Sequence, residues 1–575
     1  MRFSLWAPSA DCADLVLDGR RIALHRGADG FWGVEAAAQT GDRYRFAVDG
    51  GDPLPDPRSL WQPDGVHGDS RIVDKAELRS LHHDGFQPRP LRDAVIYEIH
   101  IGTFTPEGTY DAAQAKLAHL SDLGITHVEV MPVATFPGKH GWGYDGVYHY
   151  APMPSYGTPQ DLARFVAACH RHGLAVLLDV VYNHFGPDGN YVTAFGPYLT
   201  DRVKTPWGDA VNYDGPLSDG VRSFFIDNAL MWLEDYGFDG LRLDAVHTIY
   251  SFEAVHFLED LVTSVRNLGV KLNRHLVLIA ESDLNDPRLV HPPARGGYGL
   301  NAHWADDFHH AVHAYFTKDS NGYYVDFRGL EDVATALRAG YVYQGQFSRH
   351  RQRRHGRSPE GIESRQLVVC SQNHDQVGNR AQGERLSMLL ETRELKAIAA
   401  LLVLSPFVPL LFQGEEWGAG TPFIYFTDHE NEKLGRLVTE GRTQEFRAFD
   451  WQGEVPNPQA PGSFTQSRLD WSELQERRHQ ELLHWYRRLI ALRHDALGPV
   501  DHTEATVAFD AAADWLTFTV ADLLVAFNLA SRTRTLPLPA GGWQMILSSA
   551  DPVDDGSAEF PERCTRVYRR TAHAP

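Results

Sequence analysis

The chain has 575 residues, of which 43% are hydrophobic and 22% charged, as expected for a folded protein with a full apolar core. Its length predicts several domains, or fewer if one of them is a large barrel. Asp and Glu outnumber Lys and Arg by 75 to 54, so the formal net charge is −21. Because such a surface repels phosphate groups and anionic lipid, the composition excludes nucleic acid and membranes as expected partners.

The four cysteines lie far apart, without the close spacing of a metal site or a redox pair. We therefore expect reduced thiols, no metal ion and no cofactor. The first residues lack the apolar core of a signal peptide, and no apolar run reaches the roughly 18 residues of a membrane span. The sequence predicts a soluble, cytoplasmic protein, and we expect a monomer.

Residues 1–88 are predicted to form a small β domain. Short apolar or alternating runs at 15–17, 31–34 and 44–48 are separated by Asp-Gly and Gly-Asp turns, a spacing typical of an immunoglobulin-like β-sandwich. A stretch with two prolines follows at 86–90, where neither a helix nor a central strand continues. We therefore expect a domain boundary at residue 88.

Residues 89–497 have a different sequence pattern from residues 1–88, because short apolar runs now alternate with helical patterns. Such runs are typical of parallel strands buried on both faces. The expected strands lie at 95–99, 128–131, 175–181, 241–244, 276–280, near 300, 367–370 and 408–412. Eight strands of this kind predict an α/β fold with a closed (β/α)8 TIM barrel, whose active site lies at the carboxyl ends of the strands.

The last part of the barrel region predicts a long helix over 472–494. Ser472 and Gln475 match a capping box, and five apolar residues share one face of this helix: Leu482, Trp485, Tyr486, Leu489 and Leu492. Residues 498–575 return to alternating strands, which predict a C-terminal antiparallel β-sandwich.

Arg242 and Asp244 are the first candidate site residues, at the end of the fourth predicted strand. Side chains alternate along a strand, so these two face one way while Leu241 and Leu243 face the other. If the leucines face the helices, the charged pair enters the mouth of the barrel. The arginine then lowers the pKa of the carboxylate and keeps it ionised, as a nucleophile requires. The alternative is a buried ion pair that only stabilises the barrel.

Two further carboxylates follow later strands. Glu281 ends an apolar run, and burial of a carboxyl raises its pKa, as a general acid requires. Asp375 follows the seventh run within Asn373-His374-Asp375. Each has a plain alternative, since a strand-terminal Glu can bond a loop and this tripeptide is common in turns. Together the three predict the carboxylate pair of a retaining glycoside hydrolase, with a third carboxylate that holds the sugar.

The segments 179–184, 240–247, 280–282 and 373–375 occur in the order and spacing of four signature regions, and through them the chain resembles the α-amylase superfamily. The resemblance implies that Asp244 is the nucleophile, Glu281 the general acid/base and Asp375 the transition-state stabiliser. It also implies four residues that hold the sugar at subsite −1: Tyr144, His184, Arg242 and His374. Asn183 and Asp179 match positions near a calcium site in many amylases, yet Asp179 equally suits a partner of Arg242, and no metal is predicted.

Five stretches, at 279–287, 304–313, 322–327, 343–348 and 373–380, resemble the trehalose-releasing members of this superfamily. Residues 1–88 are similar to the carbohydrate-module-like domain that precedes the barrel in branching enzymes, in debranching enzymes and in these trehalose-releasing enzymes. The resemblance implies hydrolysis of the α-1,4 bond next to the terminal trehalose of malto-oligosyltrehalose, with release of trehalose and a malto-oligosaccharide. It also implies a functional pairing with the malto-oligosyltrehalose synthase that makes the substrate.

Residues beyond the cleaved bond must select the trehalose unit at subsites +1 and +2. The candidates are Asp283, the His-rich segment 306–310 and the loop 343–347, and the residues singled out are Asp283, Asp307, His309, Gln344 and Gln376; for each, ordinary loop packing is an equal alternative. Two rival functions stay open. A glycogen-branching transglycosylase uses the same three carboxylates and differs in its acceptor, whereas a non-catalytic binding barrel is expected to lack one of them.

Overall fold

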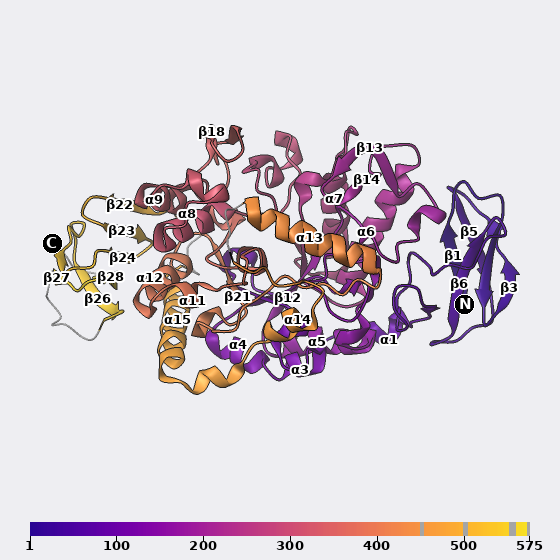
Figure 1. The fold of residues 1–575 in the computed structure, drawn as a ribbon, viewed down its shortest axis with the longest axis horizontal. Helices are drawn as coiled ribbons and strands as arrows, with labels where there is room; N and C mark the ends of the chain where they lie inside the picture. The colour runs from indigo at the N-terminus through magenta and orange to yellow at the C-terminus, as the bar shows by residue number, and fades with distance from the viewer. Residues whose placement is uncertain (449–452, 498–503, 551–558, 572–575) are drawn as a thin grey trace.

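The computed structural model describes residues 1–448, 453–497, 504–550 and 559–571. The molecule is elongated, with β-sheets at both ends and a barrel surrounded by helices between them (Figure 1). Among the described residues, no helix is both long and apolar enough to cross a membrane.

The N-terminal part forms two antiparallel sheets. One has the strand order β1-β5-β4 and the other β3-β2-β6-β7. Their bounds are β1 Arg2–Trp6, β2 Ala13–Leu17, β3 Arg20–Ala23, β4 His25–Arg26, β5 Phe31–Glu35, β6 Arg43–Val48 and β7 Ser70–Arg71. In β2 the buried side chains alternate with half-buried ones, so one face of its sheet packs on the core, as the alternating sequence predicts.

The predicted TIM barrel is confirmed as a closed sheet with the strand order β8-β9-β12-β15-β16-β17-β20-β21. The strands span Ile96–Ile99, His127–Val130, Ala175–Val180, Gly240–Leu243, Val277–Ala280, Ala302–Trp304, Leu367–Cys370 and Val408–Phe412. Each of the eight predicted runs contains or adjoins one of them, and the weak candidate near 300 corresponds to β17. All residues of these strands are buried, which explains why the runs are nearly continuous in apolar residues.

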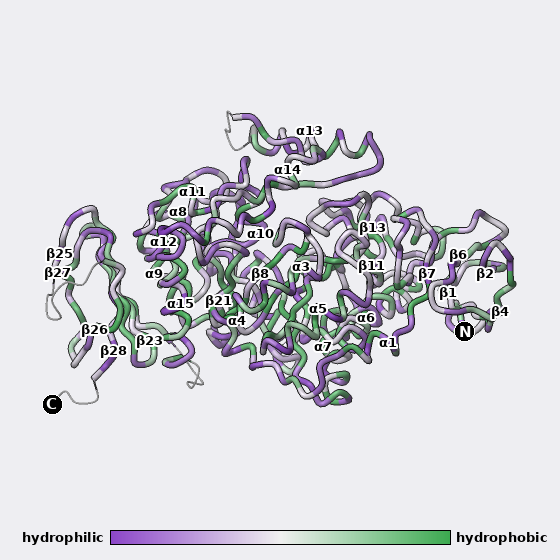
Figure 2. The backbone as a smooth tube through the Cα atoms, turned by 90° about the horizontal axis from the view of Figure 1, so that it is seen from below, coloured by the Kyte–Doolittle hydropathy of each residue, from purple (hydrophilic) through white to green (hydrophobic). Residues whose placement is uncertain are grey.

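Helices cover the outside of the barrel. The larger ones are α4 Leu117–Leu123, α5 Pro159–Arg171, α6 Ser218–Glu234, α7 Phe257–Leu272, α8 Asp306–Thr317, α9 Leu330–Ala339, α12 Thr392–Val403 and α15 Arg477–Ala496. Shorter helices lie in the connections: α1 Lys75–Ser80, α2 Ile101–Phe104, α3 Tyr110–Gln114, α10 His374–Gly378, α11 Leu386–Leu389 and α14 Pro461–Gln466. Helix α13, Glu432–Ala448, lies at the periphery on one face of the barrel (Figure 2).

Three two-stranded sheets project from the connections. They pair β10 Ala134–Thr135 with β11 Tyr148–Pro152, β13 Leu199–Thr205 with β14 Gly208–Val211, and β18 Gln344–Ser348 with β19 Arg353–Gly356. The first two lie in segments that directly follow a barrel strand, so they can add side chains to the rim where the strands end, whereas the third lies between α9 and β20.

The long helix begins later than the sequence predicts. The Asp470 side chain accepts a hydrogen bond from the Ser472 amide and caps a short 3-10 turn at Trp471–Gln475. Glu476 is extended, and α15 starts only at Arg477. The polar residues that match a capping box therefore belong to the turn, whereas Leu482, Trp485, Tyr486 and Leu489 are buried as predicted.

The C-terminal part forms an antiparallel sheet of order β22-β23-β24-β28-β26 and a pair β25-β27. Their bounds are β22 Thr506–Asp510, β23 Trp515–Val520, β24 Leu523–Asn528, β25 Arg534–Thr535, β26 Trp543–Ser548, β27 Glu559–Phe560 and β28 Cys564–Arg570. The expected boundary at residue 498 lies outside the described residues, which resume at 504.

Candidate active site

Arg242 is at the centre of the rim where β12, β15 and β16 end. It is fully buried, and its Nη1 atom donates to Asp244 Oδ1 at 2.8 Å and to Asp179 Oδ2 at 2.8 Å. Leu241 and Leu243 belong to the apolar cluster that includes the helices, so the predicted alternation places the charged pair inside the barrel. The guanidinium also lies 4.2 Å from the centre of the Trp304 ring, a cation–π contact.

Glu281 lies on the other side of the same guanidinium. Its Oε2 atom is 3.8 Å from Arg242 Nη2 and accepts a hydrogen bond of 2.6 Å from the Ala245 amide. Ala245 follows Asp244 directly and has a left-handed φ of 40°, which aims this amide at Glu281. Burial raises the pKa of Glu281 well above its usual range, although Arg242 opposes this shift.

Asp375 follows β20 and begins the short helix α10 together with His374. The Nδ1 atom of His374 is 2.5 Å from Glu98 Oε1, and its Nε2 atom is 2.7 Å from the Tyr144 hydroxyl. Burial lowers the pKa of His374, but the charges of Glu98 and Asp375 outweigh it and raise the pKa to about 9. His374 is therefore a cation near neutral pH, 3.6 Å from Asp375 Oδ2.

Tyr144 and His184 complete this group. The Tyr144 hydroxyl donates to Asp179 Oδ2 at 2.6 Å, which links it to the Arg242 network. His184 Nε2 lies 3.0 Å from the Tyr144 carbonyl oxygen, so this nitrogen carries the hydrogen. Burial lowers the pKa of His184, and its ring stacks on Trp207 at a centroid distance of 4.5 Å. The structure thus brings together all seven residues expected at the carboxylates and subsite −1.

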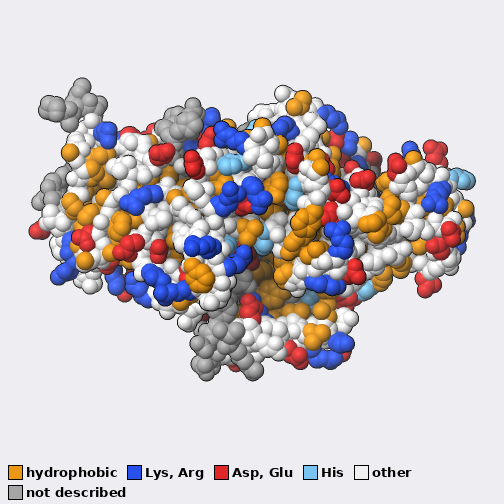
Figure 3. Space-filling view, turned by 90° about the horizontal axis from the view of Figure 1, so that it is seen from above, with side chains coloured by type: hydrophobic (Ala, Val, Ile, Leu, Met, Phe, Trp, Pro, Cys, Tyr) orange, Lys and Arg blue, Asp and Glu red, His pale blue; other side chains and the backbone are white. Residues whose placement is uncertain are grey.

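A cavity of about 470 Å³ adjoins Asp375. Its walls include Asp283, Asp306, His310, Tyr323, Arg351, Gln376, Arg380, Glu445 and Phe446. Figure 3 shows the molecule hollowed beside the projecting α13 segment, which supplies the last two of these residues. Asp283 accepts a hydrogen bond of 2.8 Å from Arg351, which comes from the turn between β18 and β19.

Three of the sequence candidates lie elsewhere. Asp307 Oδ2 accepts hydrogen bonds from the amides of Val342 and Tyr343 and from the Asn285 side chain, at 2.7–2.8 Å. His309 is buried and bonds the Ser371 carbonyl at 2.7 Å. The side-chain amide of Gln344 donates a hydrogen bond of 3.0 Å to the Tyr341 carbonyl oxygen. By contrast, Asp283 and Gln376 do line the cavity.

Sequence reasoning missed Glu98 and Trp207, and within the candidate segment 306–310 it singled out Asp307 and His309, whereas Asp306 and His310 line the cavity. Glu98 interrupts the apolar run of β8, and a buried charge in such a strand signals an interior partner. Asp306 and His310 are four residues apart on α8, so they share the face that lines the cavity, whereas Asp307 turns toward a neighbouring loop. Burial raises the pKa of Asp306 to about 7, and the nearby Asp283 and Asp375 reinforce the shift.

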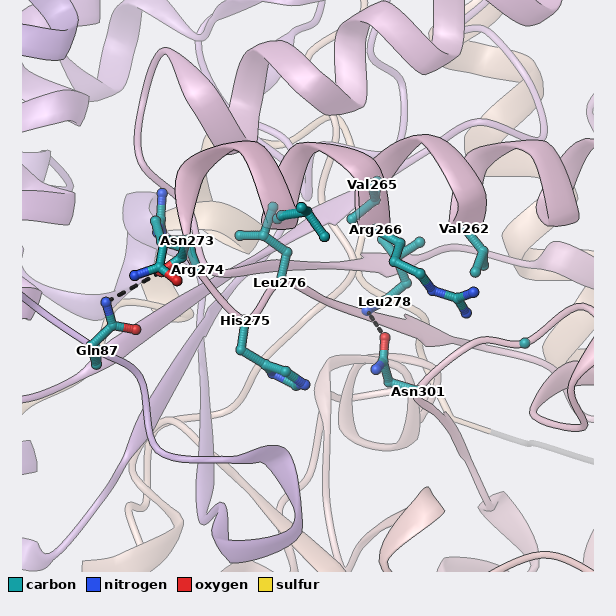
Figure 4. Close-up of a pocket in the computed structure, with 13 residues that line it drawn as sticks. Gln87, Val262, Val265, Arg266, Asn273, Arg274, His275, Leu276, Leu278 and Asn301 are labelled. Carbon is teal, nitrogen blue, oxygen red and sulfur yellow. Dashed lines mark hydrogen bonds between the residues drawn. The ribbon is translucent and has the colours of Figure 1, made fainter.

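A second cavity, of about 590 Å³, lies between α7 and the start of β16 (Figure 4). It is lined by Val262, Arg266, Leu276, Asn301 and other residues, none of them acidic. This cavity lies at the amino end of the strand and contains no carboxylate pair, so it does not compete as a site for glycoside hydrolysis. No cluster of three or more His, Cys, Asp or Glu side chains within the described residues has an arrangement that could hold a metal ion.

Comparison with known proteins identifies the family. Residues 74–200 match the model of the alpha amylase catalytic domain, and residues 502–568 match a domain of unknown function, DUF3459. The malto-oligosyltrehalose trehalohydrolase of Rhizobium sp. (strain M-11) is 46% identical over 99% of this chain and 97% of its own length. That of Arthrobacter ramosus is 48% identical over 94% of both chains.

This chain belongs to the malto-oligosyltrehalose trehalohydrolase family. It is thus an enzyme of the α-amylase class of glycoside hydrolases. A crystal structure from Salmonella typhimurium, assigned as an alpha amylase, superposes with a TM-score of 0.91 at 36% identity and covers 99% of this chain and 97% of its own. A branching enzyme of Rhizobium johnstonii is 30% identical over only 56% of this chain and 49% of its own. Membership of the malto-oligosyltrehalose trehalohydrolase family therefore rests on the whole chain, and the branching-enzyme likeness on part of it.

Proposed function

We propose that this enzyme hydrolyses the α-1,4 glucosidic bond next to the terminal trehalose of malto-oligosyltrehalose, releasing trehalose and a malto-oligosaccharide. The observation that carries the proposal is the Arg242 guanidinium, with the Asp244 carboxylate at 2.8 Å and the Glu281 carboxylate at 3.8 Å. Two carboxylates around one cation, in different environments, suit the two roles of a retaining glycosidase.

The environments divide the roles. Asp244 accepts a hydrogen bond from Arg242, which orients its carboxylate for attack on the anomeric carbon. Glu281 has a raised pKa, so it holds a proton for the glycosidic oxygen and releases the departing sugar. Water, deprotonated by Glu281, then opens the bond between Asp244 and the sugar and restores the original anomeric configuration.

Asp375 is assigned to the hydroxyl groups of the sugar at subsite −1, which it binds most tightly as the ring flattens in the transition state. Its side chain is 43% exposed, so it is open to a ligand. The cation of His374 and the neutral ring of His184 flank Tyr144, which presents a flat face to the same sugar. Arg242 binds the carboxylate of Asp244 and lies beside that of Glu281, so its role is exerted through these two carboxylates.

The cavity beside Asp375 is assigned to the trehalose unit. Trehalose is bent at its non-reducing linkage, and a concave cavity with polar walls can match this shape and its hydroxyl groups. Asp283, Asp306, His310 and Arg351 present donors and acceptors there for hydroxyl groups. Within α8, the helix face toward the cavity assigns this role to Asp306 and His310, in place of Asp307 and His309.

The substrate defines the preceding reaction. A malto-oligosaccharide ends in a reducing sugar, so an isomerising enzyme, malto-oligosyltrehalose synthase, must convert this end into trehalose before the present enzyme acts. We also place the enzyme in the cytoplasm and expect a monomer. Its four cysteines are all free, which fits a reducing compartment.

Product analysis tests this function. Purified enzyme is incubated separately with malto-oligosyltrehalose, maltopentaose and amylose, and the products are identified by chromatography. We expect trehalose from the first substrate, and the Glu281→Gln variant, which cannot donate the proton, to lose at least about 100-fold in kcat. Formation of α-1,6 branches from amylose without release of trehalose would instead establish the branching reaction.

A further inference from the structure

Helix α13 contacts the helix that carries Asp375, although the two are far apart in sequence. Arg442 of α13 donates from Nη1 to Asn379 Oδ1 at 3.0 Å and from Nη2 to the Gly378 carbonyl at 2.7 Å. Asn379 Nδ2 in turn donates to Asp375 Oδ1 at 3.3 Å. We propose that Arg442 is a positioning residue, which fixes the carboxylate of Asp375 through the side-chain amide of Asn379.

The direction of the Asn379 amide carries the argument. An amide has an oxygen that accepts and a nitrogen that donates, and rotation by half a turn exchanges them. Arg442 has no acceptor, so the atom facing it must be the oxygen. The nitrogen then faces Asp375, as a carboxylate requires. Without Arg442 the amide is free to rotate, and its oxygen would repel the carboxylate.

Arg442 is itself held in place by neighbours on α13 and by Tyr425, which precedes this helix. Its guanidinium lies 4.7 Å from the ring centre of Phe446 and 5.0 Å from that of Tyr425, and Nη1 lies 3.0 Å from Glu445 Oε2. Its side chain is only 10% exposed. A guanidinium with rings on its faces and acceptors at its edge has a fixed plane, so both bonds to α10 keep their geometry.

The alternatives for holding Asp375 are few. Within the described residues, Asn379 is the side chain that donates a hydrogen bond to its carboxylate, and His374 Nε2 lies 3.6 Å from it. The other carboxylate oxygen, Asp375 Oδ2, must stay available for the sugar. The inference rests on the proposed function, since it concerns the alignment of the transition-state stabiliser.

The test uses steady-state kinetics of the full chain on malto-oligosyltrehalose. The variants are Arg442→Met, Arg442→Lys, Asn379→Ala, the double variant Arg442→Met/Asn379→Ala and Asp375→Ala. The control is Arg436→Met, an exposed arginine on the same helix, which should leave the kinetics unchanged. Thermal unfolding of each variant shows whether the protein remains folded at the assay temperature.

We expect Arg442→Met to lower kcat about tenfold with KM changed less than about twofold, because alignment matters most in the transition state. The double variant should be no slower than Asn379→Ala, since both changes break one chain of contacts. Arg442→Lys keeps the charge but cannot make both bonds, so it should not restore kcat fully.

Three results would overturn the inference: kcat unchanged in Arg442→Met, losses that multiply in the double variant, or a rise in KM alone. The proposed function is read separately. If Asp375→Ala is inactive while Arg442→Met is normal, the function stands and the inference fails. If Asp375→Ala keeps full activity, the role of Asp375 is wrong. Should amylose branching be the reaction observed, the same kcat ratios are measured on it.

Discussion

His374 shows how single residues determine the chemistry of this site. Its pKa is raised to about 9 because the charges of Glu98, 2.5 Å from one ring nitrogen, and of Asp375 outweigh burial. At His184 burial outweighs the charges of Asp244 and Asp145, so its pKa is lowered. Two histidines beside one tyrosine therefore carry different charges. The cation of His374 lies next to Asp375, and the neutral ring of His184 can meet sugar hydroxyls without attracting a carboxylate.

The Glu98–His374 pair predicts a pH-dependent stability. The pKa of the folded histidine, about 9, exceeds the ordinary value of 6.5, so the folded state gains from the proton below about pH 6.5 and loses this gain as the pH rises through 9. The difference corresponds to about 3 kcal/mol. Glu98→Gln keeps one acceptor oxygen but removes the charge, and should lose most of this dependence, since the charge of Asp375 remains.

Unfolding of the wild type and of Glu98→Gln is measured by circular dichroism between pH 6 and pH 9.5. The stability gap between them should be widest near pH 6 and narrow steadily towards pH 9. A gap that stays constant over this range would mean that the histidine is not charged in the folded enzyme.

Helix α8 shows how one element divides its residues between binding and structure. Asp306 and His310 face the cavity, whereas Asp307, with a pKa raised to about 6 by burial, accepts three hydrogen bonds that fix the segment leading into β18. That segment continues into the turn that carries Arg351 to the cavity wall. Adjacent residues of the helix therefore have different roles: Asp306 and His310 line the cavity, whereas Asp307 holds a neighbouring segment in place.

Two variants on this helix should distinguish its role in binding from its role in structure. Asp307→Ala leaves two backbone N–H groups unpaired and should cost about 3 kcal/mol of stability. His310→Ala removes a polar wall of the cavity and should raise KM for the trehalose-ended substrate about fivefold; because the ring is buried against Tyr323 and Phe327, the change should also lower stability. Thermal unfolding and steady-state kinetics are measured for both. The division fails if His310→Ala unfolds early with unchanged KM.

Much of the fold can be predicted from the sequence because barrel strands are buried on both faces, and their apolar runs are visible without alignment. The carboxylates at strand ends follow from the same logic, since Asp244 and Glu281 come directly after such runs. The face of α8 cannot be predicted in this way, because two aspartates and two histidines lie side by side and only the packing of the helix selects among them. Arg442 gives no sequence signal, since its partner Asn379 lies 63 residues away.

At the scale of the whole molecule, Trp6 is one of the contacts that join the N-terminal sheets to the barrel, beside pairs such as Arg58–Asp227. The Trp6 ring is buried, packs edge-on against Tyr198 at 5.2 Å, and lies so close to α6 that a Cβ added at Gly220 would come within 2.1 Å of it. The indole N–H bonds the Asp29 carbonyl at 3.1 Å, which fixes the ring in its own domain. Every residue assigned to catalysis lies in the barrel, so this contact concerns stability.

The close approach of the Trp6 ring predicts that the usual effect of a Gly→Ala substitution on stability is reversed at Gly220. In a helix, replacing glycine by alanine normally stabilises by about 0.5–1 kcal/mol. Here Gly220→Ala should destabilise instead, because its methyl group displaces the Trp6 ring and separates the N-terminal sheets from the barrel. Trp6→Ala should lower stability by about 3 kcal/mol through the cavity that it leaves. In that background the methyl group has room, so adding Gly220→Ala should raise stability again.

Calorimetry of the four proteins measures this cycle, with kcat expected to stay within about twofold throughout. If the two substitutions destabilise additively, the ring does not anchor the N-terminal sheets at α6.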